Sequence, residues 1–186
     1  MSETGDRIIQ LQNDRLVVNW REVETGEPYP RYDAMVERFQ RAMNDLNAFV
    51  DDDQLGHIAI TQVELSYINH VEPPPSGDEA RVGELLRGWP GTPEHHLGQP
   101  AQTRLQLTFE VPDVGNPPVR MFVSVEPVIH VDRQERQLMT LSVRGAPVAD
   151  SVAAALKFVD GAHEHLVRSF LELTPEPMHS TWGLKI

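Results

Sequence analysis

The chain has 186 residues, of which 40% are hydrophobic and 24% charged, so one domain with a substantial core is expected and wholesale disorder is excluded. Its 16 Lys and Arg are outnumbered by 28 Asp and Glu, and the net charge of −12 argues against nucleic acid as a partner. The chain contains no cysteine, which excludes disulfides, thiolate nucleophiles and thiolate zinc sites.

No apolar run of signal-peptide length stands at the amino terminus, and no stretch approaches the ~20 apolar residues needed to cross a bilayer. We therefore expect a cytoplasmic protein with no membrane association.

The first predicted elements are a β-hairpin and a helix. Short apolar runs flank Asn13 and Asp14, two residues that tolerate the positive φ of a tight turn, so residues 7–21 are predicted to form the hairpin. After a turn-rich connector, apolar residues recur at helical spacing along one side of residues 32–50. They are Tyr32, Met35, Val36, Phe39, Met43, Leu46 and Val50.

Residues 57–72 are predicted to form a strand. Alternation places Val63, Leu65, Tyr67 and Asn69 on its core face, and Glu64 and His70 on the opposite, wetter face. Glu64 and His70 lie about 20 Å apart along such a strand, at ~3.3 Å per residue, so they cannot act together as an acid–base pair.

A loop rich in Pro and Gly is predicted at about 73–100. Long connections without secondary structure are uncommon in compact domains and are often functional. Trp89 could anchor a partner or fold back over the sheet, and His95 and His96 could share a metal or simply be solvated. We treat Trp89, His95 and His96 as a candidate partner-contact loop.

Three alternating segments follow, centred on Leu107, Val123 and Leu141, and short connections join them. This pattern is typical of an antiparallel meander with one wet face. The last element is a long helix that begins after a cap at Asp150 or Ser151, and two prolines end it at Pro175 and Pro177. Its predicted buried stripe is Val152, Leu156, Val159, His163, Leu166, Phe170 and Leu173.

The element order is therefore β-β-α-β-loop-β-β-β-α. It predicts an α+β fold for a single domain spanning residues 1–186, with the loop insertion at about 73–100. The expected architecture is a two-layer sandwich, in which two long helices cover one face of an antiparallel sheet of about six strands.

His163 is the one histidine on an apolar stripe. A buried neutral imidazole needs a partner for each ring nitrogen. Asp160, one turn earlier, could supply one partner, and Asn69 or Tyr67 could supply the other. Tyr67, Asn69, Asp160 and His163 thus form a predicted polar cluster with either a ligand-binding or a structural role.

The sequence indicates no catalytic residue, no cofactor and no metal site. His163 and His165 are two residues apart on a helix and face opposite ways, and Val167 stands where the zincin pattern needs its second histidine. No glycine-rich phosphate loop and no Gly-x-Ser-x-Gly motif is present.

Three stretches in combination are similar to a known group. They contain Asn19-Trp20, Tyr29-Pro30, Tyr67-Ile68-Asn69-His70, and then Asp160, His163, Phe170, Thr174 and Trp182-Gly183. Together they resemble a sporadically distributed family of uncharacterised bacterial proteins. The resemblance implies no activity. Similar proteins carry an additional amino-terminal unit before the hairpin, so it implies that this chain is a short form or works with a partner that replaces the unit.

Two functions from different classes are consistent with these patterns. The first is a non-enzymatic protein-interaction module, in which an uncovered sheet edge pairs with a protein partner or with another copy of the chain. The alternative is a small-molecule-binding protein or hydrolase, whose pocket would lie between the last helix and the sheet near Asn69 and His163.

Overall fold

The computed structural model describes residues 5–23, 28–71, 85–87, 96, 102–129, 133 and 135–183. The chain divides into two compact units. The first comprises Met1–Thr61 and Ala149–Lys157, and the second comprises Gln62–Val148 and Phe158–Ile186.

The first unit contains a β-hairpin of β1 (Arg7–Leu11) and β2 (Leu16–Trp20). The Gln12 N–H donates to the carbonyl of Arg15, so Asn13 and Asp14 form the predicted two-residue turn. Neither turn residue has positive φ; outside glycine, the described residues that do are Arg31, Gln54 and Arg133. The position of the turn was predicted correctly, but its expected conformation was wrong.

The same unit contains α1 (Arg31–Asp52), which extends one or two residues beyond each predicted end. Every residue of the predicted stripe is buried or half-buried, and Met43 is the most buried of them. Trp20 at the end of β2 packs edge-on against Tyr29, with ring centroids 5.1 Å apart. The apolar periodicity therefore identified the packed side of α1.

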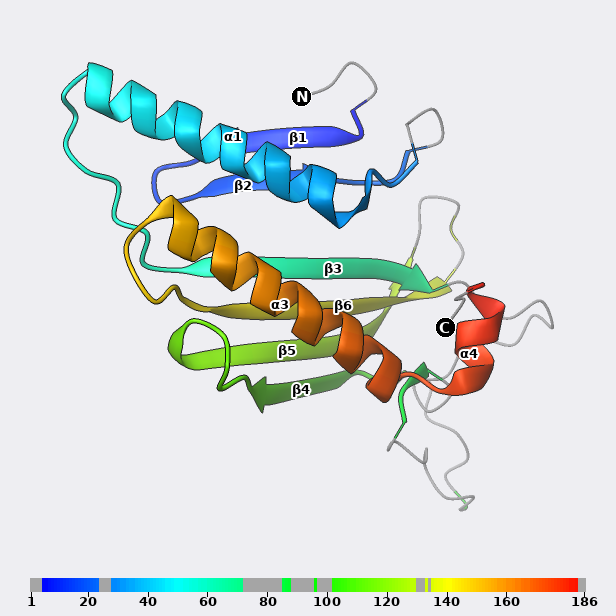
Figure 1. Cartoon of the computed structure of the whole chain (residues 1–186). Helices are drawn as coiled ribbons and strands as arrows, with labels where there is room; N and C mark the ends of the chain where they lie inside the picture. Colours follow the sequence, from blue (N-terminus) through cyan, green and yellow to red (C-terminus); the bar gives the residue numbers. More distant parts are fainter. Residues whose placement is uncertain are drawn as a thin grey trace. The chain divides into compact units, whose positions relative to one another are not determined.

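The second unit is built on four antiparallel strands: β3 (Val63–Val71), β4 (Leu105–Glu110), β5 (Asn116–Ile129) and β6 (Glu135–Ala146). Their order in the sheet is β3-β6-β5-β4, as Figure 1 shows. The α+β class and antiparallel pairing are confirmed. The prediction of one sheet of about six strands is wrong, because β1 and β2 form a separate two-stranded sheet. Alternation marks each strand but does not say which strands share a ladder of hydrogen bonds.

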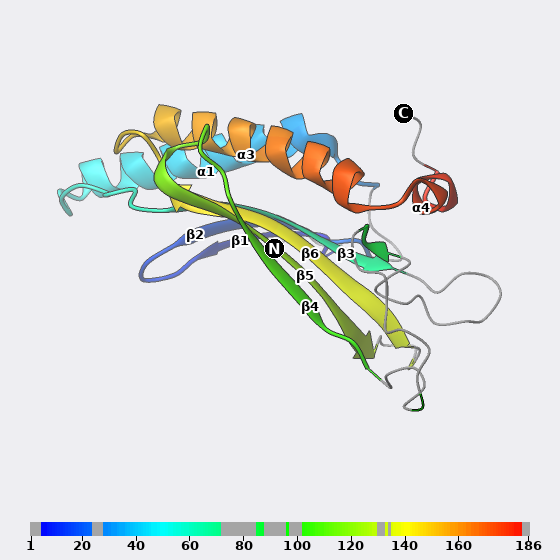
Figure 2. The same cartoon turned by 90° about the horizontal axis from the view of Figure 1, so that it is seen from below.

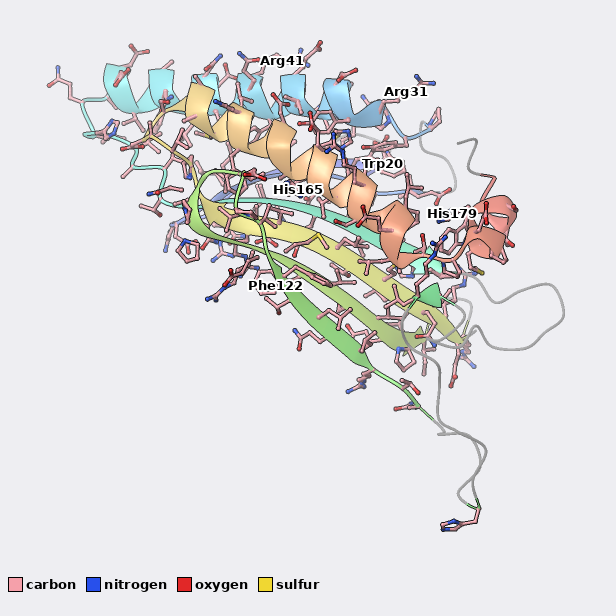
Figure 3. All side chains as sticks on the ribbon, turned by 60° about the horizontal axis from the view of Figure 1, so that its bottom comes forward. Trp20, Arg31, Arg41, Phe122, His165 and His179 are labelled. Atoms are coloured by element: carbon pink, nitrogen blue, oxygen red, sulfur yellow. The ribbon has the colours of Figure 1, made fainter. Side chains whose placement is uncertain are left out.

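One face of the four-stranded sheet carries the core. Cross-strand register aligns its inner residues, and most of them are almost completely buried. They are Val119, Met121, Val123 and Val125 on β5, and Met139, Leu141 and Val143 on β6. The other face carries polar and charged residues, and the apolar Phe122 also lies on it (Figure 3). On β5 and β6 the alternating residues that the sequence pattern places inward are buried, whereas Phe109 on β4 and Asn69 on β3, also expected on the inward face, are exposed.

From Phe158 onward, the helix α3 (Val152–Leu173) runs along the core face of this sheet (Figure 2). Phe158, Ala162 and Leu166 are its most deeply buried residues in the second unit. Every residue of the predicted stripe is buried or half-buried, with Val159 and Leu166 buried and His163 and Phe170 half-buried. The expectation of two long helices on one shared face is not matched, since α1 belongs to the first unit.

Gly115 explains how closely α3 approaches the sheet. It has a φ of 66°, and a Cβ built there would lie 2.7 Å from the Phe158 ring and 2.4 Å from the Ala146 carbonyl oxygen. A side chain would be both strained and in steric conflict at this position. Glycine thus permits the turn before β5 to pack against the helix.

The strand β3 begins six residues later than predicted, because another contact holds the segment before it. The Asp150 carboxylate accepts a hydrogen bond from the Ile60 N–H at 2.6 Å and lies 2.8 Å from His57 Nε2. Ser151 caps α3 by accepting the Ala154 N–H at 3.2 Å. Of the two predicted caps, Ser151 serves the helix and Asp150 secures residues 57–60.

A short helix, α4 (Glu176–Thr181), follows α3 directly. The sequence predicts a tail here, because Pro175 and Pro177 indicate the end of a helix. Proline is compatible with the first turn of a helix, where the missing N–H has no intrahelical partner, and Pro177 occupies such a position. Among the described helices, none combines the length and apolar character needed to cross a bilayer.

Candidate functional site

Tyr67 and His163 meet between β3 and α3. The Tyr67 hydroxyl lies 2.8 Å from His163 Nδ1, and the two rings pack edge to face with centroids 6.1 Å apart. Both side chains are half-buried. The structure therefore brings together two of the four residues in the predicted polar cluster, and it selects Tyr67 rather than Asn69 as the partner of His163 from β3.

The other two residues of the cluster are more exposed. Asn69 lies on the same face of β3 as Tyr67, but its side chain is exposed near the end of the strand. Asp160 lies one turn before His163 on α3 and is also exposed.

The candidate partner-contact loop is mostly outside the described residues. Trp89 and His95 lie outside them, and His96 is exposed. On α3, Glu164 is 3.5 Å from Arg168 in an exposed ion pair, beside the half-buried His165. Within the described part of the chain, no group of three His, Asp or Glu residues could hold a metal ion.

A buried polar contact that the sequence did not predict joins α3 to α4. Thr174 Oγ1 lies 2.7 Å from His179 Nε2, and the Thr174 hydroxyl donates to the Phe170 carbonyl. Because the hydroxyl proton is used in that way, the oxygen accepts from His179, which fixes the proton of the imidazole on Nε2. Thr174 is 0% exposed and His179 4% exposed. Figure 3 shows His179 where α3 meets α4.

Aromatic rings and a distant arginine complete this contact. His179 stacks on Phe170, whose ring also packs against Trp182 at 5.4 Å. Arg87 donates its N–H to the Leu173 carbonyl and its Nε to the Thr174 carbonyl, so it caps the end of α3. A threonine beside an imidazole could act as a nucleophile–base pair, but full burial and the bond to the main chain assign this pair to the docking of α4.

The only sequence signal for this contact was the resemblance, whose pattern includes Phe170, Thr174 and Trp182. Spacing alone did not reveal it, because the turn between α3 and α4 brings residues 174 and 179 together.

The strand β4 lies at one edge of the four-stranded sheet. The Val111 N–H donates to the Val119 carbonyl at 2.9 Å, and this pair continues the register of β4 with β5. In an antiparallel ladder, alternate residues direct both main-chain groups to the same neighbour. The main chain of Leu105, Leu107 and Phe109 therefore points to β5, and that of Gln106, Thr108 and Glu110 points outward.

Three properties of this edge favour contact with another strand. No strand pairs with its outer side among the described residues (Figure 1). Gln106, Thr108 and Glu110 are exposed, and so is Phe109, at 40%. Proteins protect edge strands with lysine, proline or a bulge, and β4 has none of these between Leu105 and Glu110. We refer to the outward main chain of Gln106, Thr108 and Glu110 as the β4 edge.

The opposite edge strand of the sheet is β3. Its Glu64 pairs with Arg144 of β6 at 2.8 Å and accepts the Ser66 hydroxyl at 3.0 Å. Arg144 also lies over the ring of Phe122, 5.6 Å from its centroid. Glu64 and Arg144 are thus engaged with neighbouring side chains on the polar face of the sheet.

Comparison with protein-family models, curated proteins and solved structures found no match to this chain.

Proposed function

We propose that the chain is a non-enzymatic protein-interaction module that binds an extended strand of a protein partner along the β4 edge. The observation that carries this proposal is the row of outward N–H and C=O groups on three successive alternate residues, all exposed. An added strand would satisfy these groups and extend the sheet from four strands to five.

The side chains of β4 provide a surface for recognition. Leu105 and Leu107 are half-buried on the core face, and Phe109 is exposed beside them, so a partner strand could cover apolar area there. On the opposite face, Gln106, Thr108 and Glu110 present polar groups. The edge therefore favours a strand that alternates apolar and polar residues in the same way.

Proline at position 108 tests this proposal directly. Thr108→Pro removes an outward N–H while leaving the bonds of Leu107 and Phe109 to β5, and proline is tolerated where its missing N–H faces solvent. Thr108→Val is the matched control, because it keeps the N–H and has good strand propensity. Both variants should melt close to the wild type.

The assay is competitive photo-crosslinking in cell extract. The absence of native cysteine allows a photoreactive group to be attached at Thr108→Cys alone. Adducts with protein should form, and an excess of unlabelled wild type or Thr108→Val should suppress them. Thr108→Pro should fail to compete. The proposal is wrong if no adduct forms, or if Thr108→Pro competes as well as the wild type.

A further inference from the structure

We infer that one occupant of the β4 edge is a second copy of this chain, paired antiparallel about a two-fold axis at Leu107. This inference rests on the proposed function and specifies its partner. It follows from the register of β4 with β5 and from the distribution of charge and apolar side chains along the strand.

Main-chain geometry restricts the pairing to a few registers. Hydrogen bonds can form only when outward residues of one copy lie opposite outward residues of the other. The two-fold axis must therefore pass through a residue and not between two residues, and the registers centred on Gln106, Leu107 and Thr108 keep most of β4 paired. Each choice keeps the α3-covered faces of both copies on the same side, because the side chains alternate together.

The register centred on Leu107 matches the apolar residues. It places Leu107 opposite Leu107 of the second copy, and Leu105 opposite Phe109 of the second copy. Leu105 and Leu107 are half-buried and Phe109 is exposed, so each would cover apolar surface on the other. Aromatic–aliphatic pairs across antiparallel strands are stabilising.

The same register also pairs the charges. Gln106 lies opposite Thr108 of the second copy, and these outward residues exchange both N–H···O bonds. Arg104 lies opposite Glu110 of the second copy, at both ends of the paired region. Glu110 is already opposite Arg120 within its own sheet, so it would lie between two arginines.

The two alternative registers lose the pairing of Arg104 with Glu110. Centring on Gln106 sets Arg104 opposite Thr108 and leaves Glu110 opposite Gln102. Centring on Thr108 sets Arg104 opposite Pro112, which lacks the N–H that the ladder requires at an outward position. Only the register centred on Leu107 pairs both charges and all three apolar residues.

The dimer should be weak and reversible. One six-residue strand buries much less surface than a standard stable interface. Each copy also carries a net charge of −12, which opposes association over long range and is screened at physiological ionic strength. We expect the weight-average mass to rise from 21.0 kDa towards twice that value between micromolar and millimolar concentration.

A cysteine scan of the purified full chain tests the register. Residues opposite each other in a non-hydrogen-bonded pair have Cα atoms about 4.5 Å apart, within the range that a disulfide spans. Leu107→Cys should therefore form a disulfide-linked dimer on mild oxidation. Gln106→Cys and Thr108→Cys, each offset from its own symmetry mate, should link at least tenfold more slowly.

A mixing experiment tests the charge pairing without altering the core. Arg104→Glu and Glu110→Arg should each dimerise about tenfold more weakly than the wild type, since like charges then face each other at both ends. An equimolar mixture of the two variants should form a heterodimer, because that combination restores both opposite-charge pairs. Melting curves of each variant establish that Glu110→Arg folds beside Arg120.

These outcomes separate the inference from the proposed function. A strict monomer at millimolar concentration, or fastest disulfide formation at Gln106→Cys or Thr108→Cys, overturns the inference. An equimolar mixture of Arg104→Glu and Glu110→Arg that shows no preference for the heterodimer also overturns the inference. Adducts with protein could still form at Thr108→Cys in cell extract. If Thr108→Pro fails to suppress them, they would still support strand binding by another protein. Preferred linkage through Leu107→Cys and selective heterodimer formation together support the second copy.

Discussion

Thr174→Val should destabilise the second unit well beyond the usual effect of removing one hydroxyl. The substitution preserves the shape of the side chain but leaves the His179 Nε2–H buried without its acceptor. His179 Nδ1 already has no hydrogen-bond partner among the described residues. An unsatisfied buried polar group costs about 1–3 kcal/mol, so we expect the free energy of unfolding to fall by about 2 kcal/mol.

Thr181→Val is the matched control, because the Thr181 hydroxyl donates to the Pro177 carbonyl in an exposed setting. Its cost should be within about 0.5 kcal/mol. Urea unfolding of both variants, followed by circular dichroism, measures the difference. If Thr174→Val costs no more than Thr181→Val, the buried pair does not hold α4 as inferred.

A second substitution, added to Thr174→Val, distinguishes the hydrogen bond between Thr174 and His179 from simple packing of the two side chains. Replacing both partners by apolar residues of similar shape can be nearly neutral, because no polar group is then left unsatisfied. Thr174→Val combined with His179→Phe should therefore cost less than the sum of the two single changes. Strict additivity would contradict the hydrogen bond between them.

Three further predictions follow from other contacts. Tyr67→Phe removes the bond to His163 and should lower the free energy of unfolding by about 1 kcal/mol in thermal or urea unfolding; no change would argue against a structural role for the pair. Gly115→Ala should cost at least about 2 kcal/mol more than Gly56→Ala, because both glycines have positive φ but only Gly115 is closely packed; equal costs would contradict the close approach of α3. The hydrogen bond from the Ile60 N–H and the contact with His57 lower the pKa of Asp150 below its usual 3.8. The charged carboxylate therefore stabilises residues 57–60 above pH 3.8, and this stabilisation is lost as the pH falls through the lowered pKa. Hydrogen exchange of the Ile60 amide should therefore be faster in Asp150→Asn at neutral pH, and faster in the wild type under acid conditions. Unchanged exchange in Asp150→Asn would refute the contact between Asp150 and Ile60.

Local pattern was a good guide to the elements of this protein. The stripe of α1, the buried faces of β5 and β6, and the position of the turn at Asn13 and Asp14 all follow from spacing along the sequence, which reflects local backbone geometry. The contact of His163 with β3 could also be anticipated. An imidazole that lies among the apolar residues of a helix needs a hydrogen-bond partner from the element that packs against that helix.

Features that depend on distant parts of the chain were not predictable in the same way. Alternation does not show that β4 rather than another strand lies at an edge, or that β1 and β2 pair only with each other. The late start of β3 depends on Asp150, 90 residues from Ile60. The contact between Thr174 and His179 depends on a helix that begins with a proline pattern usually associated with helix ends.

The polar face of the four-stranded sheet has a further consequence for how the unit opens. Register aligns Glu64, Arg144, Arg120 and Glu110 in one row across all four strands, with the two guanidinium groups on the inner strands and one carboxylate on each outer strand. The two arginines are thus neighbours at the middle of the row, and the glutamate at each end offsets the charge of the arginine beside it. Concentrated salt weakens such exposed attractions. Fraying should then begin at the periphery of the sheet, while the long β5–β6 ladder, backed by its apolar face, is the last part to separate.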